Sequence, residues 1–138
     1  MKKSQRQIVY ERAEKYAKEH LKKINVSMGD YDGGQKCQHV ARHRLETEEC
    51  SKLVVALSFV PKSGVNVHII NFGETKYIDH THGYLSKRNT YYLIKEYELE
   101  EIKDENMSKF LTHHKEEMLN KLFTSKERTD LKINLNNI

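Results

Sequence analysis

The chain has 138 residues, of which 37% are hydrophobic and 32% are charged, and it carries a formal net charge of +4. This length and composition predict a single domain over residues 1–138 with a core of modest size. Acidic residues are interleaved with the basic ones along the chain. That pattern argues against the concentrated positive face of a nucleic-acid-binding protein.

Two features of the sequence argue against a membrane-embedded or secreted protein. The longest apolar run, residues 53–60, is too short to span a bilayer, and the N-terminal segment has no hydrophobic signal region. We therefore expect a cytoplasmic protein without membrane contact. In that compartment Cys37 and Cys50 are expected to be free thiols rather than a disulfide.

The first half of the chain predicts two helices and a buried strand. Apolar residues recur at helical spacing over residues 4–24, which predicts an amphipathic N-terminal helix. Its lysines and arginines alternate with glutamates, which favours a solvated face over a polyanion-binding one. Glycines and aspartates over 28–34 predict a loop, and a second helix over 35–49 follows, with Cys37 in its first turn. Residues 53–60 are apolar on both faces and predict a central strand.

The second half of the chain predicts a hairpin, one more strand and one more helix. The hairpin has strands over 65–72 and 75–79, joined by a tight turn at Gly73–Glu74. A further strand is expected over 90–97 and a last helix over 107–123, after which the polar chain end is expected to fray. Together the elements predict an α+β fold: a small antiparallel sheet, the cysteine-bearing helix packed on one face, and the terminal helices around it.

The hairpin places His68 opposite Asp79, on one face of the sheet. Directly opposed residues have Cβ atoms about 5 Å apart, so the imidazole Nδ1–H can donate to the carboxylate. A histidine held by a carboxylate is a general base, and Cys37 would be its nucleophile. A thiol in the first turn of a helix feels the positive end of the helix dipole. Together with an imidazolium, the dipole lowers a thiol pKa from about 8.5 into a range of roughly 3.5 to 7.5.

A purely structural interpretation of the same residues remains open. Cys37 continues the apolar stripe of its helix, where a free cysteine packs as a small hydrophobic residue. His68 and Asp79 could equally form an exposed cross-strand ion pair, which contributes little to stability. The combination of the three residue types favours catalysis.

Three short sequence patterns surround these residues: Cys37-Gln38-His39-Val40-Ala41, Val67-His68-Ile69-Ile70-Asn71 and Tyr77-Ile78-Asp79-His80-Thr81. In this order they resemble the core of papain-like cysteine hydrolases, especially small bacterial and phage members related to the transglutaminase-like branch. The resemblance covers about residues 30–97 and implies a papain-like fold. It also implies that Cys37 is the nucleophile, His68 the base and Asp79 the residue that orients the base.

The chain departs from the family pattern at two places. Papain has an oxyanion-hole glutamine six residues before its cysteine, where this chain has Tyr31. Gln35 lies nearer, so Tyr31 and Gln35 are the candidate oxyanion-stabilising or substrate-binding residues, and the backbone N–H of Cys37 is a further donor. The tryptophan common after the family's histidine is absent, since the chain contains no tryptophan.

A zinc site is the main chemical alternative. Four residues have side chains of the types that bind zinc: Cys37, His39, His43 and Cys50. On a helix, however, the cysteine points away from the two histidines. His80 and His82, beside Asp79, form a second cluster without a recognisable metal motif. We therefore predict no metal and no cofactor.

The sequence thus predicts a cysteine-nucleophile enzyme that transfers acyl groups from a protein or peptide substrate. It would be a peptidase or amidase if water is the acceptor, and a transferase if an amine is. A second hypothesis is a catalytically inactive papain-like module, for instance encoded by a phage, that binds or regulates a partner protein through Tyr84, Tyr91 and Tyr92. A third assigns nucleic-acid binding to the N-terminal helix.

Overall fold

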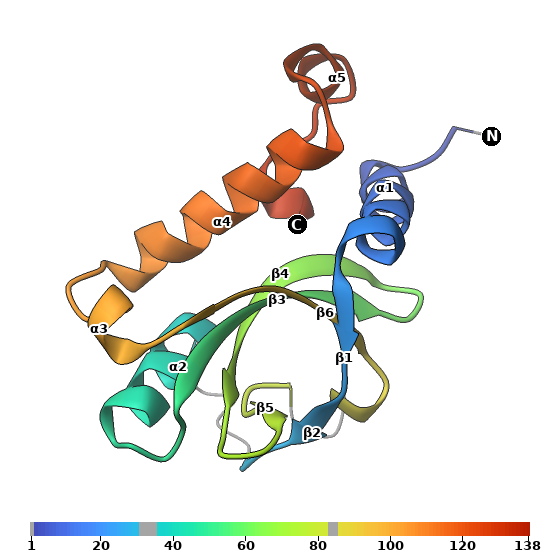
Figure 1. Ribbon diagram of the computed structural model, residues 1–138. Coiled ribbons are helices and arrows are strands. Elements are labelled where there is room, and N and C mark those ends of the chain that lie inside the picture. Colours follow the sequence, from blue (N-terminus) through green and yellow to red (C-terminus); the bar gives the residue numbers. More distant parts are fainter. Residues whose placement is uncertain (1, 31–35, 83–85) are drawn as a thin grey trace.

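The computed structural model describes residues 2–30, 36–82 and 86–138. Its centre is a six-stranded sheet with the strand order β1-β6-β3-β4-β5-β2, which is strongly curled (Figure 1). The elements in chain order are α1 (Gln5–His20), β1 (Lys22–Ile24), β2 (Val26–Met28), α2 (Cys37–Glu46), β3 (Lys52–Val60), β4 (Gly64–Phe72), β5 (Tyr77–Asp79), β6 (Thr90–Tyr97), α3 (Leu99–Ile102), α4 (Met107–Leu122), α5 (Ser125–Asp130) and the 3-10 helix η2 (Leu135–Asn137).

The fold is α+β, but the prediction of a small antiparallel sheet is wrong. The sheet is mixed, because β2 pairs in parallel with β5 whereas the other neighbouring strands are antiparallel. The predicted N-terminal helix ends at His20, since Leu21 already has an extended backbone. The residues that follow form β1 and β2. β1 pairs with β6 at one edge of the sheet, and β2 pairs with β5 at the other edge. This single segment therefore brings the two edges of the sheet together and produces the curl.

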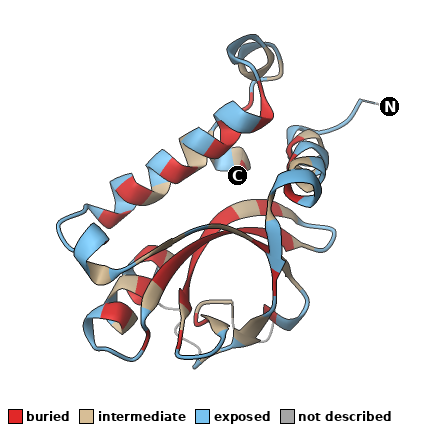
Figure 2. Cartoon of the chain, in the orientation of Figure 1, coloured by how far each residue is buried: buried red, intermediate tan, exposed pale blue. Residues whose placement is uncertain are grey.

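β3 lies near the middle of the sheet and is buried on both faces, as its uninterrupted apolar sequence predicts. On the outer face Leu53, Val55 and Leu57 belong to the main core, which α1 and α4 cover (Figure 1). On the inner face Val54 and Ala56 belong to a second, smaller apolar cluster inside the curl. Figure 2 shows that α4 turns a buried stripe toward the sheet and an exposed face outward.

Two tyrosines that were expected to be exposed are buried. Tyr91 belongs to the inner cluster and Tyr92 to the main core. They are consecutive residues of β6, so their side chains point to opposite faces of the sheet. Tyr84, the third tyrosine of the binding-module hypothesis, lies outside the described residues.

The C-terminal segment is ordered rather than frayed. α5 and η2 follow α4 directly, and Ile133 and Ile138 are buried in the main core. Arg12 of α1 donates hydrogen bonds to the Leu122 carbonyl and to the Glu127 carboxylate. The two ends of the chain are therefore packed against each other. Across the three described ranges, none of the helices is long and apolar enough to cross a membrane.

Candidate active site

The hairpin that carries His68 and Asp79 has a different register from the predicted one. Phe72 pairs with Tyr77, so residues 73–76 form the connecting loop, and the Gly73 N–H donates to the Lys76 carbonyl over 2.8 Å. Each β4 residue is therefore paired with a residue two positions later in the sequence than predicted. Because side chains alternate with a period of two, this shift changes the partner but not the face. His68 and Asp79 share a face without being directly opposed.

The curl of the sheet brings these two side chains into contact. His68 Nε2 lies 3.0 Å from Asp79 Oδ2, so the carboxylate meets Nε2 rather than the predicted Nδ1. His68 is 3% exposed and Asp79 is fully buried, which contradicts the interpretation as an exposed cross-strand ion pair. A buried ion pair with good geometry interacts far more strongly than a surface pair.

Asp79 accepts hydrogen bonds on both carboxylate oxygens. Besides His68, Oδ2 accepts from the Tyr91 hydroxyl at 2.6 Å and lies 3.2 Å from His82 Nδ1. Oδ1 accepts from the backbone N–H groups of Thr81 and His82 and from the Thr81 hydroxyl. Burial raises the pKa of Asp79, but these donors and the charge of His68 hold it well below its usual range. Asp79 is therefore a carboxylate at neutral pH.

Cys37 approaches His68 from α2, at an open edge of β4. The β4–β5 pairing covers Asn71 and Phe72, so among the described residues no strand lies beside the preceding part of β4 on that side. The N-terminus of α2 lies at this place, where the backbone N–H of Ile69 is close enough to the Cys37 sulfur to lower its pKa. The Asn71 amide secures the helix, since Nδ2 donates to the Ala41 carbonyl at 3.0 Å.

The Cys37 thiol lies close enough to the His68 imidazole for each group to shift the pKa of the other. Since Asp79 occupies Nε2, Nδ1 is the ring nitrogen left for the sulfur. Burial raises the pKa of Cys37, but the interaction with His68 outweighs it, and the net pKa lies below the ordinary thiol value. Burial lowers the pKa of His68, but the interactions with Asp79 and Cys37 raise it to about 9. Both shifts favour a thiolate–imidazolium pair.

The structure thus brings Cys37, His68 and Asp79 together in the order nucleophile, base, carboxylate. Tyr31 and Gln35, the candidate oxyanion or substrate residues, lie outside the described residues. The sequence reasoning missed Gln38, which is buried and whose Oε1 lies 3.6 Å from the Cys37 sulfur. As the first residue of α2, Cys37 also has a backbone N–H that no carbonyl of its own helix accepts.

Three further residues of the site were not predicted to be part of it: Thr81, His82 and Tyr91. The sequence holds a local indication for the first two. An aspartate commonly accepts from the backbone N–H groups two and three residues later, and Thr81 and His82 stand at these distances from Asp79. For Tyr91 the indication is the alternation of β6, which places it on the inner face.

His68, Asp79 and His82 are the described residues whose side chains are close enough to hold a metal ion together. The zinc set of Cys37, His39, His43 and Cys50 is not brought together. The two histidine rings of the close group are stacked, with centroids 4.0 Å apart and an angle of 3° between their planes. An ion between parallel rings would lie out of both ring planes, whereas an imidazole binds a metal through a lone pair in its plane. The geometry therefore fits hydrogen bonding to Asp79 better than metal coordination.

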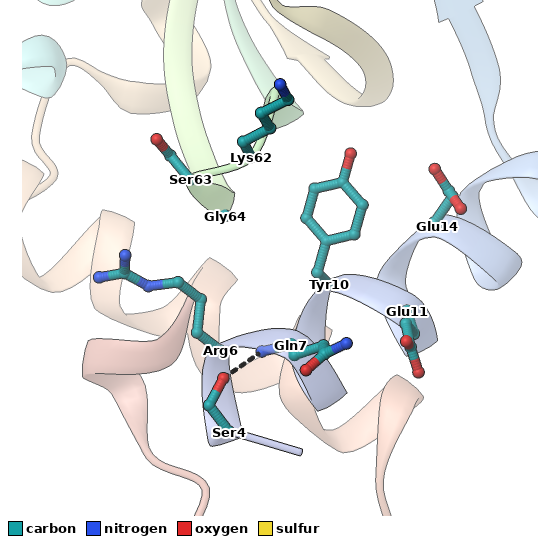
Figure 3. Close-up of a pocket in the computed structure, with 9 residues that line it drawn as sticks. All are labelled: Ser4, Arg6, Gln7, Tyr10, Glu11, Glu14, Lys62, Ser63 and Gly64. Carbon is teal, nitrogen blue, oxygen red and sulfur yellow. Dashed lines mark hydrogen bonds between the residues drawn. The ribbon is translucent and has the colours of Figure 1, made fainter. Parts of the chain in front are cut away.

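A pocket of about 560 Å³ lies elsewhere, between the start of α1 and the β3–β4 turn (Figure 3). Arg6, Tyr10, Glu14 and Lys62 are among the residues that line it. It contains neither a cysteine nor a histidine, so it offers no thiol–imidazole pair. We therefore place the candidate chemistry at Cys37 and not in this pocket.

Comparisons with known proteins identified no relative of this chain. No protein-family model matches the chain, and no curated protein or solved structure does so either. The papain-like resemblance therefore rests on the short sequence patterns alone.

Proposed function

We propose that this protein is an enzyme that transfers acyl groups through Cys37, with His68 as the general base and Asp79 as the residue that orients it. The observation that carries the proposal is a buried imidazole that hydrogen-bonds to a buried carboxylate and interacts with a neighbouring thiol, so that the two groups shift each other's pKa. This is the arrangement that activates a nucleophile in covalent catalysis.

The proposed reaction begins with transfer of the thiol proton from Cys37 to His68. The thiolate attacks the carbonyl carbon of an amide or thioester, and a C–S bond forms. His68 then returns the proton to the leaving amine or thiol as its bond to the carbonyl carbon breaks. Water or an amine attacks the resulting thioester, which releases the acyl group and regenerates the thiol.

Oxyanion stabilisation would come from the N-terminus of α2. The backbone N–H of Cys37 lies beside its own sulfur and has no helical acceptor, so it can donate to the oxygen of the tetrahedral intermediate. The dipole of α2 favours negative charge at the same end. Both effects act on the carbonyl that the sulfur attacks.

Reaction with p-nitrophenyl acetate tests the proposal. We expect a burst of one equivalent of nitrophenolate and an acetyl group on Cys37, located by peptide mass spectrometry. His68→Ala should slow the burst by about a hundredfold or more, because general-base catalysis is lost.

Cys50→Ser is the matched control and should leave the burst unchanged. Cys50 is buried, and burial together with the charge of Glu49 raises its pKa. A burst that survives Cys37→Ser, or equal acetylation of Cys37 and Cys50, would contradict the proposal. The binding-module hypothesis would then gain support.

A further inference from the structure

His82 lies flat against His68 and hydrogen-bonds to the same carboxylate. Its ring is parallel to that of His68 within 3°, at a centroid distance of 4.0 Å. The two imidazoles therefore form a stacked pair above a shared acceptor, Asp79 Oδ2. In the proposed acyl-transfer reaction His82 takes part in no proton transfer.

The orientation of the His68 ring plane depends on the groups that surround the ring. The torsion that rotates an imidazole about its Cβ–Cγ bond has a broad energy profile, so the side chain itself does not fix the plane. The Nε2 atom also has a competing neighbour, since Thr81 Oγ1 lies 3.2 Å away and Asp79 Oδ2 3.0 Å away. A small rotation of the ring would move Nε2 from Asp79 Oδ2 toward Thr81 Oγ1, and it would also move Nδ1 relative to the Cys37 sulfur.

The ring of His82 is itself held in place. Its Nδ1 atom lies 3.2 Å from Asp79 Oδ2 and 3.4 Å from the Tyr91 hydroxyl, so an N–H on this atom can donate to either oxygen. Tyr91 lies in β6, so the plane of the His82 ring is tied to the central sheet. A ring fixed in this way can fix the one stacked on it.

His82 is also the side chain of this group that reaches solvent. Its side chain is 22% exposed, whereas those of His68 and Asp79 are 4% and 0% exposed. The His82 ring therefore covers the His68–Asp79 hydrogen bond on its solvent side. Exclusion of water strengthens such a bond, because the local dielectric constant is low.

We infer that His82 is a positioning residue, whose ring face fixes the plane of His68 and shields its hydrogen bond to Asp79. The inference deepens the proposed function, since it concerns the same site. Its direct consequence is that the ring of His82, and not its N–H, sets the proportion of Cys37 present as a thiolate. The groups that act on this ionisation are His68 from β4, Asp79 from β5 and the Ile69 N–H.

Two substitutions separate the ring from the hydrogen bond. His82→Asn keeps a side-chain N–H near the position of Nδ1 but removes the ring, and His82→Phe keeps the ring but removes the donor. The measurement is the rate of Cys37 alkylation by iodoacetamide against pH, together with thiolate absorbance near 240 nm. It reports the thiol–imidazole pair even if no acyl group is ever transferred, so it can fail independently of the burst experiment.

We expect His82→Asn to slow alkylation at pH 6 by about tenfold and to move the profile to higher pH, since misplacement of a catalytic group by a fraction of an ångström costs a comparable factor. His82→Phe should stay within about threefold of the parent protein. His113→Asn, on the exposed face of α4, is the matched control and should change nothing.

A parent-like profile for His82→Asn would overturn the inference. So would a His82→Phe variant that is folded and as impaired as His82→Asn, because the donor and not the ring would then be responsible. Circular dichroism establishes the fold of each variant. If His82→Phe does not fold, the His82→Asn profile alone decides, since only the inference predicts its displacement.

Discussion

His68 decides the charge state of the whole site, because its imidazole hydrogen-bonds to the Asp79 carboxylate and interacts with the Cys37 thiol. Its pKa of about 9 lies above the ordinary value of histidine, whereas that of Cys37 lies below the ordinary value of a thiol. Between these two values the pair is ionised. Reactivity should therefore rise as pH increases through the Cys37 pKa and acyl transfer should fall as pH increases through about 9, where His68 can no longer protonate the leaving group.

Removal of the imidazole tests this charge assignment. At pH 6 an ordinary thiol of pKa about 8.5 is less than roughly 1% ionised, so fast alkylation of Cys37 at this pH requires the pair. We expect His68→Ala to move the alkylation profile of Cys37 to higher pH and to make it slow at pH 6. Cys50 in the same molecule is the internal standard, because its pKa is raised by burial. Alkylation of Cys37 that is no faster than that of Cys50 in the parent protein would contradict the assignment.

At the scale of elements, the parallel pair of β2 and β5 holds Asp79 in place. The pairing ends with Met28 beside Asp79, and the next residue, Gly29, donates its N–H to the Asp79 carbonyl at 2.9 Å. A Cβ atom at Gly29 would lie 2.3 Å from His80 Nδ1 and 2.5 Å from Ile78 Cγ2. His80 is buried, so it cannot move aside without disturbing the packing.

We therefore expect Gly29→Ala to separate β2 from β5 and to displace Asp79. The free energy of unfolding should fall by about 1–3 kcal/mol, as for other overpacked sites, and alkylation of Cys37 at pH 6 should slow. The matched control is Gly73→Ala in the β4–β5 loop, where the new Cβ would meet Ile78 Cδ1 at 3.2 Å. Equal stability and equal Cys37 reactivity in the two variants would show that the β2–β5 pair does not hold the carboxylate.

The same elements show which parts of the fold a single sequence can predict. Strong periodicity predicted α4 and β6 within a residue of their bounds, and the alternation along β4 placed His68 on the correct face. Residues 22–24 were assigned to the N-terminal helix because Ile24 continues its helical spacing, and no strand was predicted at 26–28, whereas pairing with distant strands makes both segments extended. Such long-range pairing overrides local preference.

The site was predictable to a similar extent. The residue types and their order suggested Cys37, His68 and Asp79, because the side-chain period of two survives an error in the turn. The contribution of His82 and Tyr91 depends on the curl of the sheet, which no local pattern encodes. His114 on α4 illustrates the same limit: it is buried and its Nε2 lies 2.8 Å from the Tyr97 hydroxyl, a contact that the helical pattern does not predict.

At the scale of the whole molecule, the terminal helices and the sheet share one core. Val9, Ala13 and Ala17 of α1 are fully buried together with Leu119 of α4 and strand residues of β3. Ile133, which follows α5, packs into the same core. If this core is continuous, disruption at the C-terminal end should destabilise the sheet as well.

Ile133→Ala tests whether the 138 residues unfold as a single cooperative unit. Loss of this buried side chain should lower the free energy of unfolding by about 3 kcal/mol. Far-UV circular dichroism reports the helices, and the reactivity of Cys50, buried just before β3, reports the sheet. Both probes should show one coincident transition, moved to lower temperature by the same amount, because all elements share the core.

The exposed pair of Lys126 and Asp130 supplies the control for Ile133→Ala. Lys126→Ala should change stability by less than about 0.5 kcal/mol, as surface substitutions usually do. In native conditions Ile133→Ala should leave the pH profile of Cys37 alkylation unchanged, since Ile133 follows α5 whereas Cys37 and His68 belong to α2 and β4. A helical transition that precedes exposure of Cys50 would mean that the C-terminal helices form a separate folding unit, and the single-domain prediction would be wrong.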